Sequence, residues 1–283
     1  MKIIRSFLFV PAANERLLQS ALDKTSDAVI LDLEDGTHPS LRAQARECLA
    51  ESIARVKASD KIAAVRINGD WLTTVVDLQA AVVRGLDLLV LPKVEHPRDV
   101  QIIDQMVTDL ENRGDLPPRH IRFLLQIESA QALPRLHEIA SASSRTMGMM
   151  LGSEDYSLDC GSLPTPDALL YPSMAVLTAA RAARIQPIGF LASIADLGSV
   201  DAFRQVLERA RTLGFRGAVI VHPKFLDAVN KAYTPSPEAL AQAQRIVTDF
   251  EAALARGEGA IKVEGVMVDK PVYRRALDLI AQA

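Results

Sequence analysis

Short runs of apolar residues recur along the chain, and each is followed by a longer segment in which apolar positions repeat at helical spacing. Within a run such as Ala28–Leu33 the apolar residues are nearly consecutive, which is typical of a strand buried on both faces. Eight such runs predict eight strands. They are Ser6–Pro11, Ala28–Leu33, Ile62–Ile67, Leu88–Lys93, Ile121–Glu128, Thr146–Gly152, Pro187–Ala192 and Gly217–Pro223.

The segments between these runs predict helices. They are Glu15–Lys24, Leu41–Lys57, Thr73–Arg84, Pro97–Arg113, Ala130–Ser141, Ser173–Arg184 and Asp201–Leu213. Helices that surround a parallel sheet keep both faces of every strand away from water, so the alternation indicates an α/β fold. We expect a (β/α)8 TIM barrel with a C-terminal helical extension; a doubly wound open sheet is the competing topology.

The last part of the chain departs from this repeat. Residues Ser236–Gly259 predict one long, capped amphipathic helix with a glycine stop, followed by a short hairpin-like piece and a final helix. Such a segment has too little core to be stable alone, so we expect it to pack on a barrel, either its own or a neighbour's. The expected division is a catalytic barrel over residues 1–235 and an extension or lid over residues 236–283.

Composition limits the class of protein. The chain has 283 residues, of which 49% are hydrophobic, and its net charge of −3 with dispersed basic residues indicates neither a nucleic acid nor a membrane surface as partner. The two cysteines, Cys48 and Cys160, are too few for a disulfide framework or a zinc cluster. No run approaches the ~18 apolar residues of a membrane span. The apolar run Phe7–Pro11 near the N-terminus is too short for a signal-peptide core. These features favour a cytoplasmic protein with a small-molecule partner.

Charged residues gather at the carboxyl ends of the predicted strands, where barrels carry their active sites. The stretch "DAVILDLEDG" (Asp27–Gly36) ends in the carboxylates Asp32, Glu34 and Asp35. Because unpaired buried carboxylates are costly, we expect this cluster at the barrel mouth, facing Arg66, Lys93 and a cation.

Two further carboxylates, Glu128 and Asp155, follow consecutive predicted strands and could meet over the barrel axis. Ligands that are all oxygens suit a hard ion such as Mg²⁺, which keeps several waters that a substrate can displace. The alternative is that Glu128 forms an ordinary ion pair with Arg122 or Arg66.

Several stretches resemble the citrate lyase β-subunit-like branch of the HpcH/HpaI aldolase superfamily. They are "RSFLFVPAANERLL" (Arg5–Leu18), "DAVILDLEDG", "AVRING" (Ala64–Gly69), "LVLPKVE" (Leu89–Glu95), "QIESAQAL" (Gln126–Leu133), "LGSEDY" (Leu151–Tyr156), "VIVHPKFLDAVNKAYTPS" (Val219–Ser236) and "GVMVDKPV" (Gly265–Val272). The resemblance implies a TIM barrel that uses Mg²⁺ to cleave a 3-hydroxyacyl-CoA of the citramalyl, malyl or citryl type into acetyl-CoA and a 2-oxo acid.

The resemblance also implies a role for each matching residue. Glu128 and Asp155 are implied as the Mg²⁺ ligands, and Glu34 and Asp35 as the carboxylates that hold metal-bound waters. Arg66 is implied as the arginine beside the reacting carbonyl, and the backbone N–H groups of Gly152, Ser153 and Glu154 as the groups that receive the substrate carboxylate. Asp269 of a neighbouring subunit is implied as the acid/base, and Arg16 as a contact near the coenzyme A phosphates. The implied assembly is a trimer or a multiple of one, such as a hexamer.

Other functions stay open at this point. A malyl-type acyl-CoA thioesterase would use the same site with water as the attacking group, and a non-catalytic protein would bind an oxo acid without turnover. Lys93 could form a Schiff base or a salt bridge with Glu34 or Glu128, and we expect His222 to position other groups rather than act as a base. Gly189, Ser20 and Val266 depart from the family pattern, so neither the acyl group nor its carrier is defined.

Overall fold

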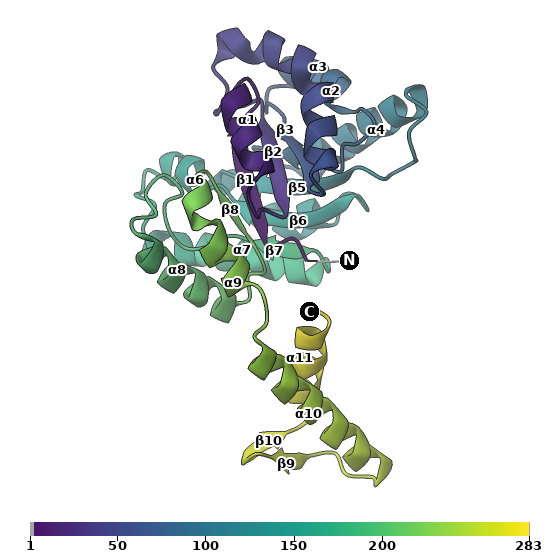
Figure 1. Ribbon diagram of the computed structural model, residues 1–283, viewed down its shortest axis with the longest axis vertical. Coiled ribbons are helices and arrows are strands. Elements are labelled where there is room, and N and C mark those ends of the chain that lie inside the picture. Colours follow the sequence, from purple (N-terminus) through teal and green to yellow (C-terminus); the bar gives the residue numbers. More distant parts are fainter. Residues whose placement is uncertain (1–2, 283) are drawn as a thin grey trace. The chain divides into compact units, whose positions relative to one another are not determined.

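The computed structural model describes residues 3–282 and divides into two compact units. One unit is Ile4–Asn230, and the other consists of the residues from Lys231 onward together with Ile3. Figure 1 gives the order of the elements along the chain.

The first unit contains a parallel sheet in which the strands follow one another in the order β7-β6-β5-β4-β3-β2-β1-β8. The strands are β1 (Ser6–Pro11), β2 (Ala28–Asp32), β3 (Ile62–Arg66), β4 (Leu88–Leu91), β5 (Arg122–Ile127), β6 (Thr146–Leu151), β7 (Gln186–Ile188) and β8 (Ala218–Ile220). Next to the two end strands, Gly189 donates its N–H to the carbonyl of Gly217 and Arg216 donates to that of Pro187, each over 2.9 Å. These bonds join β7 to β8, so the predicted barrel is confirmed and the open sheet is excluded.

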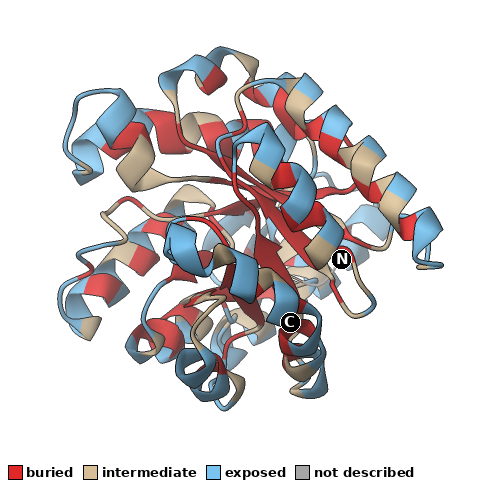
Figure 2. Cartoon of the chain, turned by 90° about the horizontal axis from the view of Figure 1, so that it is seen from above, coloured by how far each residue is buried: buried red, intermediate tan, exposed pale blue. Residues whose placement is uncertain are grey.

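Helices surround the strands, and Figure 2 shows their exposed outer faces around a buried centre. They are α1 (Glu15–Leu22), η1 (Pro39–Leu41), α2 (Arg42–Ala58), α3 (Trp71–Ala81), α4 (Pro97–Arg113), η2 (Ala130–Arg135), α5 (Leu136–Ala140), α6 (Ser153–Asp159), α7 (Pro166–Ala182), α8 (Val200–Leu213), η3 (Pro223–Phe225) and α9 (Leu226–Ala232). None of the helices in residues 3–282 is long and apolar enough to cross a membrane.

Two helix predictions were wrong in detail. The segment expected as one helix, Ala130–Ser141, is a 3-10 turn followed by a short α-helix, because Pro134 has no N–H to continue the ladder. The helix α6 was not expected at all, since it has only 7 residues and directly follows β6.

Alternating positions of the strands fill the barrel interior. The lower layers are apolar, with residues such as Phe7, Ile30 and Ala64 packed against one another. Two positions further along the same alternation come Asp32 on β2 and Arg66 on β3, which are partners in register. The barrel core therefore ends in a layer of buried polar side chains at the carboxyl ends of the strands.

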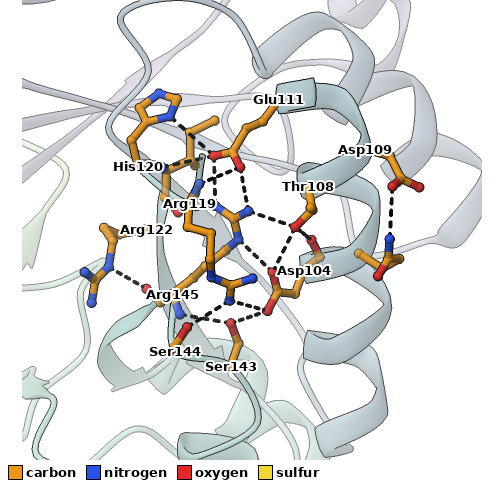
Figure 3. A network of polar contacts seen from close by, with 12 residues as sticks. Asp104, Thr108, Asp109, Glu111, Arg119, His120, Arg122, Ser143, Ser144 and Arg145 are labelled. Carbon is orange, nitrogen blue, oxygen red and sulfur yellow. Dashed lines mark hydrogen bonds and ion pairs between the residues drawn. The ribbon is translucent and has the colours of Figure 1, made fainter. Parts of the chain in front are cut away.

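A second buried polar cluster lies at the amino ends of β5 and β6 (Figure 3). The guanidinium of Arg145, fully buried, donates to both carboxylate oxygens of Glu111 at 2.8 and 2.6 Å and to Oδ1 of Asp104 at 2.7 Å. It also donates to the hydroxyl of Thr108 and to the carbonyl of Ile121. Because these partners lie on α4 and before β5, Arg145 ties helix and strands together at the end opposite the polar layer.

The second unit consists of α10 (Pro237–Ala255), the antiparallel pair β9 (Ile261–Val263) and β10 (Val266–Val268), and α11 (Lys270–Ile280). Its small core includes Phe250, whose ring centroid lies 5.0 Å from that of Tyr273. Asp269 caps α11 by accepting the N–H of Val272 at 3.2 Å. The predicted long helix, hairpin and final helix are confirmed.

Candidate active site

A cavity of about 490 Å³ lies at the carboxyl ends of the barrel strands. Its lining has two sides. The charged side comes from the segments after β2, β3 and β6, namely Asp32, Asp35, Arg66, Glu154 and Asp155; the apolar side comes from β1, β7 and β8 and includes Phe9, Phe190, Ile194, Val219 and Val221. Because carboxylates outnumber the one guanidinium on the charged side, a ligand with an apolar body and a polar end that contacts Arg66 or a bound cation would match this division.

Arg66 is the central cation of the site. Its Nε donates to Oδ1 of Asp32 at 2.7 Å and its Nη2 to Oδ2 at 2.6 Å, while Nη1 lies 2.9 Å from Oε2 of Glu34. The guanidinium also stacks 4.7 Å above the ring centroid of Phe9. Burial disfavours the charge, but these carboxylates raise the pKa of Arg66 above its ordinary value, so it stays charged. One further N–H on each of Nη1 and Nη2 is left for a ligand.

Asp32 does more than neutralise Arg66. The same carboxylate accepts the backbone N–H of Glu34 at 3.0 Å and that of Gly36 at 2.8 Å. A Cβ atom on Gly36 would lie 2.4 Å from Oδ2 of Asp32, so only glycine fits against this carboxylate. Asp32 therefore holds the guanidinium of Arg66 and shapes the loop that carries Glu34 and Asp35.

Glu34 and Asp35 diverge, although the sequence suggested a pair. Asp35 is exposed, whereas Glu34 is only 3% exposed, and burial raises its pKa while Arg66 opposes the rise. Its carboxylate lies at ion-pair distance from Arg66 and from Nζ of Lys93 (3.2 Å), yet neither oxygen accepts a well-directed hydrogen bond from the described residues. These oxygens can accept hydrogen bonds from water around a bound ion.

Lys93 forms the salt bridge with Glu34 that the sequence suggested. Partial burial opposes its charge, but the attraction of Glu34 outweighs burial, and the pKa of Lys93 is raised. A Schiff-base lysine needs a lowered pKa to be a free amine near neutral pH, so this arrangement argues against that role.

Glu128 follows β5 and is 4% exposed. Its Oε2 accepts the backbone N–H of Lys93 and its Oε1 accepts Nε2 of Gln126, each at 2.7 Å. Burial, reinforced by the charge of Glu34, raises the pKa of Glu128 to about 8. Gly152 leaves room for it, because a Cβ there would lie 2.6 Å from Cγ of Glu128. Of the two arginines in the alternative interpretation, Arg66 acts on Glu128 electrostatically and Arg122 does not; Glu34 and Asp155 are the other charges that act on it.

Asp155 lies in the first turn of α6, not at the end of β6 as the sequence suggested. It lines the cavity with Gly152, Ser153 and Glu154, and its charge contributes to the raised pKa of Glu128. Within residues 3–282 no three His, Cys, Asp or Glu side chains lie together as a ready-made metal site. The carboxylate of Asp155 in the cavity lining and that of Glu128, with which it interacts electrostatically, suit Mg²⁺, which completes its oxygen shell with waters and substrate.

Three other residues singled out from the sequence are not part of this cluster. Arg16 is exposed on α1, although the next residue, Leu17, lines the cavity. His222 is the exposed cap of η3 and accepts the N–H of Lys224 at 3.1 Å. Asp269 belongs to the second unit, where it caps α11.

Two residues are central to the geometry although neither was predicted to have a role of its own: Asp32, which was expected only as a member of the carboxylate cluster at the barrel mouth, and Gln126. A signal for both was available. Asp32 stands at an even spacing from Ala28 and Ile30, and Gln126 from Leu124, so both belong to inward-facing positions of their strands. A polar side chain at an inward position near the carboxyl end of a barrel strand indicates a site residue.

Comparison with known proteins agrees with this geometry. The model of the family described as HpcH/HpaI aldolase/citrate lyase matches residues 5–223. The chain is 33% identical to the citrate lyase subunit beta of Leuconostoc mesenteroides, over 97% of this chain and 91% of that protein. It is also 33% identical to an L-malyl-CoA/beta-methylmalyl-CoA lyase of Cereibacter sphaeroides, over 99% and 94%.

Among solved structures, the chain resembles CitE of Mycobacterium tuberculosis in complex with magnesium, acetoacetate and coenzyme A, with a TM-score of 0.74 and 28% identity over 98% of this chain and 97% of that one. A citrate lyase of Burkholderia xenovorans shares the fold, with a TM-score of 0.84 at 19% identity. The chain belongs to the HpcH/HpaI aldolase/citrate lyase family.

Proposed function

We propose that this protein is a Mg²⁺-dependent carbon–carbon lyase that cleaves a 3-hydroxyacyl-CoA of the citramalyl, malyl or citryl type into acetyl-CoA and a 2-oxo acid. The observation that carries the proposal is the arrangement of Glu128 and Arg66. A buried carboxylate fixed through both oxygens and an arginine with two unused N–H groups belong to one charged layer at the open end of the barrel. The relatives named above are lyases of this class.

Mg²⁺ would be held by Glu128 and Asp155, and when bound it supplies Lewis-acid chemistry that polarises a substrate oxygen. Glu34 and Asp35 would bind the waters that surround the ion. The unsatisfied oxygens of Glu34 fit this role, because they face no donor in good geometry within residues 3–282. Backbone N–H groups of Ser153 and Glu154 would receive the substrate carboxylate at the start of α6. The N–H of Gly152, which was expected to join them, instead donates to the carbonyl of Ile127 at 2.8 Å.

Cleavage breaks the bond between the hydroxyl-bearing carbon and the carbon next to the thioester. The hydroxyl gives its proton to a base and its carbon becomes the carbonyl of the 2-oxo acid, while the electron pair of the broken C–C bond moves into a thioester enolate. The two unused N–H groups of Arg66 would stabilise the enolate oxygen, a contribution of about 3–4 kcal/mol by analogy with an oxyanion-hole donor. A proton must then reach the enolate carbon.

Asp269 is the proposed proton donor, supplied by the extension of a neighbouring subunit in a trimer or hexamer. The cap hydrogen bond of Asp269 is made through Oδ1, and the residue is half-buried. Its carboxylate is therefore not fully enclosed, as a proton donor to a substrate requires. Residues 236–283 are thus proposed as a lid contributed in trans. Arg16 is proposed as a contact for the coenzyme A phosphates, and the two free thiols fit a cytoplasmic protein.

A panel of malyl-CoA, citramalyl-CoA and citryl-CoA, incubated with Mg²⁺ or with EDTA, tests the function. We expect acetyl-CoA and the matching 2-oxo acid with Mg²⁺ and neither with EDTA. Free coenzyme A with an intact hydroxy acid would instead show a thioesterase. Oxo-acid binding without any turnover would show a non-catalytic protein.

Variants locate the metal. Glu128→Gln and Asp155→Asn are expected to abolish both Mg²⁺ binding, measured by calorimetry, and turnover. Asp159→Asn is a matched control on the same helix, because Asp159 only accepts the N–H of Ala130 and lies outside the cavity lining. Full activity of Glu128→Gln would contradict the proposed metal site.

A further inference from the structure

The side chain of Gln126, a residue of the cavity lining, carries a buried hydrogen-bond acceptor that no described residue uses. Gln126 is 6% exposed and belongs to the cavity lining on β5. Its carbonyl oxygen Oε1 accepts no hydrogen bond from any residue that the structure describes. A buried carbonyl without a donor is unfavourable, so such a group at a site indicates a partner that arrives with the ligand.

The orientation of the amide is fixed by its neighbour. Nε2 of Gln126 donates to Oε1 of Glu128 at 2.7 Å, and in the ionised form of Glu128, which is the form that binds a cation, this carboxylate can only accept. Reversing the amide would place two acceptors against each other. The carbonyl end of the amide therefore points away from Glu128. The nearby backbone N–H of Lys93 does not serve it, because that N–H donates to the other oxygen of Glu128.

We propose that Oε1 of Gln126 accepts a hydrogen bond from the hydroxyl group of a bound hydroxy acid. This rests on the proposed function in one respect, because a 3-hydroxyacyl thioester is the ligand that would bring the hydroxyl. The 2-oxo acid formed by cleavage has no donor at that carbon. Gln126 thereby favours the hydroxylated substrate over the product, and its amide N–H keeps Glu128 in place at the same time.

Binding of two small probes tests this without turnover. The dissociation constants of malate and of succinate, which lacks the hydroxyl, are measured by calorimetry at saturating Mg²⁺ for the wild type and for Gln126→Leu. We expect the ratio of succinate to malate dissociation constants to fall about tenfold in the variant, the effect of one lost hydrogen bond. Met150→Leu is the matched control, since Met150 pairs with Gln126 in register, lines the same cavity and offers no acceptor of this kind.

The competing role for Gln126 is purely to orient Glu128. In that case Gln126→Leu weakens Mg²⁺ binding and weakens malate and succinate equally, and an unchanged ratio overturns the proposal. The proposal would also be overturned if Met150→Leu changed the ratio of dissociation constants as much as Gln126→Leu does. If the wild type cleaves no acyl-CoA but the ratio still falls in Gln126→Leu, the lyase function is wrong, while the contact between Gln126 and the hydroxyl group of the ligand is supported.

Discussion

The backbone N–H of Lys93 donates to Oε2 of Glu128 over 2.7 Å, so the end of β4 directly fixes a carboxylate that follows β5. Lys93 has a φ of +52°, in the left-handed region that lysine rarely adopts. The same residue places its ammonium 3.2 Å from Glu34. A single strained residue thus connects two carboxylates that repel each other, and strain of this kind is held where the surrounding structure and the function require it.

Gly152→Ala is expected to weaken Mg²⁺ binding about 10- to 100-fold, the usual cost of disturbing a group that orients a metal ligand. The added Cβ would lie 2.6 Å from Cγ and 2.7 Å from Oε1 of Glu128, so this carboxylate must move. The backbone itself tolerates alanine, because Gly152 has a φ of −83°. Calorimetry with Mg²⁺ measures the effect.

The matched control is Gly69→Ala, in which the new Cβ meets the side chain of Lys93 at an ordinary 3.5 Å. We expect its Mg²⁺ affinity to equal that of the wild type. Equal affinities for Gly152→Ala and the wild type would mean that Glu128 does not hold the ion.

Mg²⁺ binding should depend on pH because Glu128 must be ionised to bind a cation. Its pKa is raised to about 8 by burial and by the charge of Glu34. Below that pH the ion displaces a proton, so the apparent affinity should rise about tenfold per pH unit and level off above about 8.

The metal-free protein should show the opposite trend in stability. A carboxylate with a raised pKa in the folded state stabilises that state fully below its ordinary pKa, and this stability is lost as the pH rises through about 8. Thermal unfolding of the wild type and Glu128→Gln, with EDTA, checks the sign. The wild type should lose stability relative to the variant as the pH rises, and a constant difference would contradict the raised pKa.

Asp32→Asn should lower kcat on the order of 10²-fold while changing the affinity for Mg²⁺ little. The amide places an NH₂ donor against the donors of Arg66, so the guanidinium turns away from the geometry set by the two bonds of 2.7 and 2.6 Å. A fall in kcat of this size is the usual effect of losing one oxyanion-hole donor. Steady-state kinetics on the cleaved acyl-CoA, together with Mg²⁺ calorimetry, separates the two effects.

A control in the same loop distinguishes orientation from general loosening. Thr37 donates its hydroxyl to the carbonyl of Asp32 at 2.6 Å and accepts the N–H of Ala12, but it does not touch the carboxylate of Asp32. Thr37→Val should therefore lower the unfolding free energy and leave kcat near the wild-type value. If both variants lose activity in proportion to stability, the specific role of Asp32 is wrong.

Most of the fold could be predicted from the sequence because strands that are dry on both faces leave an unmistakable apolar pattern. Short elements without such a pattern could not. The helix α6 shares its first residues with the motif that follows β6. The strand β7 was predicted over Pro187–Ala192 but has only 3 residues and ends at Ile188, just before Gly189 with its φ of +143°. Local propensity over so few residues is weak compared with tertiary contacts.

The site was predictable in its residue types and not in its contacts. Glu34 and Asp35 are adjacent in sequence, yet one is buried and the other exposed, because the loop after β2 turns around the carboxylate of Asp32. Sequence spacing does not reveal which carboxylate becomes the centre of such a turn. The pairing of Asp32 with Arg66 depends on strand register, which appears only once the barrel closes.

Arg145→Met should destabilise the fold by about 3–5 kcal/mol without changing kcat. The substitution leaves the buried carboxylates of Glu111 and Asp104 without their main cation, and the cost of breaking a buried pair on one side is of that size. The cluster drawn in Figure 3 lies at the amino ends of β5 and β6, and none of its labelled residues lines the cavity at the carboxyl ends of the strands. Urea unfolding and kinetics on the same samples measure both quantities.

The control is Arg122→Met, which removes one hydrogen bond from Nε of Arg122 to the carbonyl of Arg145 and should cost about 1 kcal/mol. Burial opposes ionisation of Glu111 and Asp104, but hydrogen bonds, those from Arg145 among them, outweigh it and lower both pKa values. The stability from these carboxylates is therefore present above their ordinary pKa and lost as the pH falls. The difference in unfolding free energy between the wild type and Arg145→Met should narrow in acid. A difference that does not change with pH would mean that Arg145 stabilises the fold by packing alone.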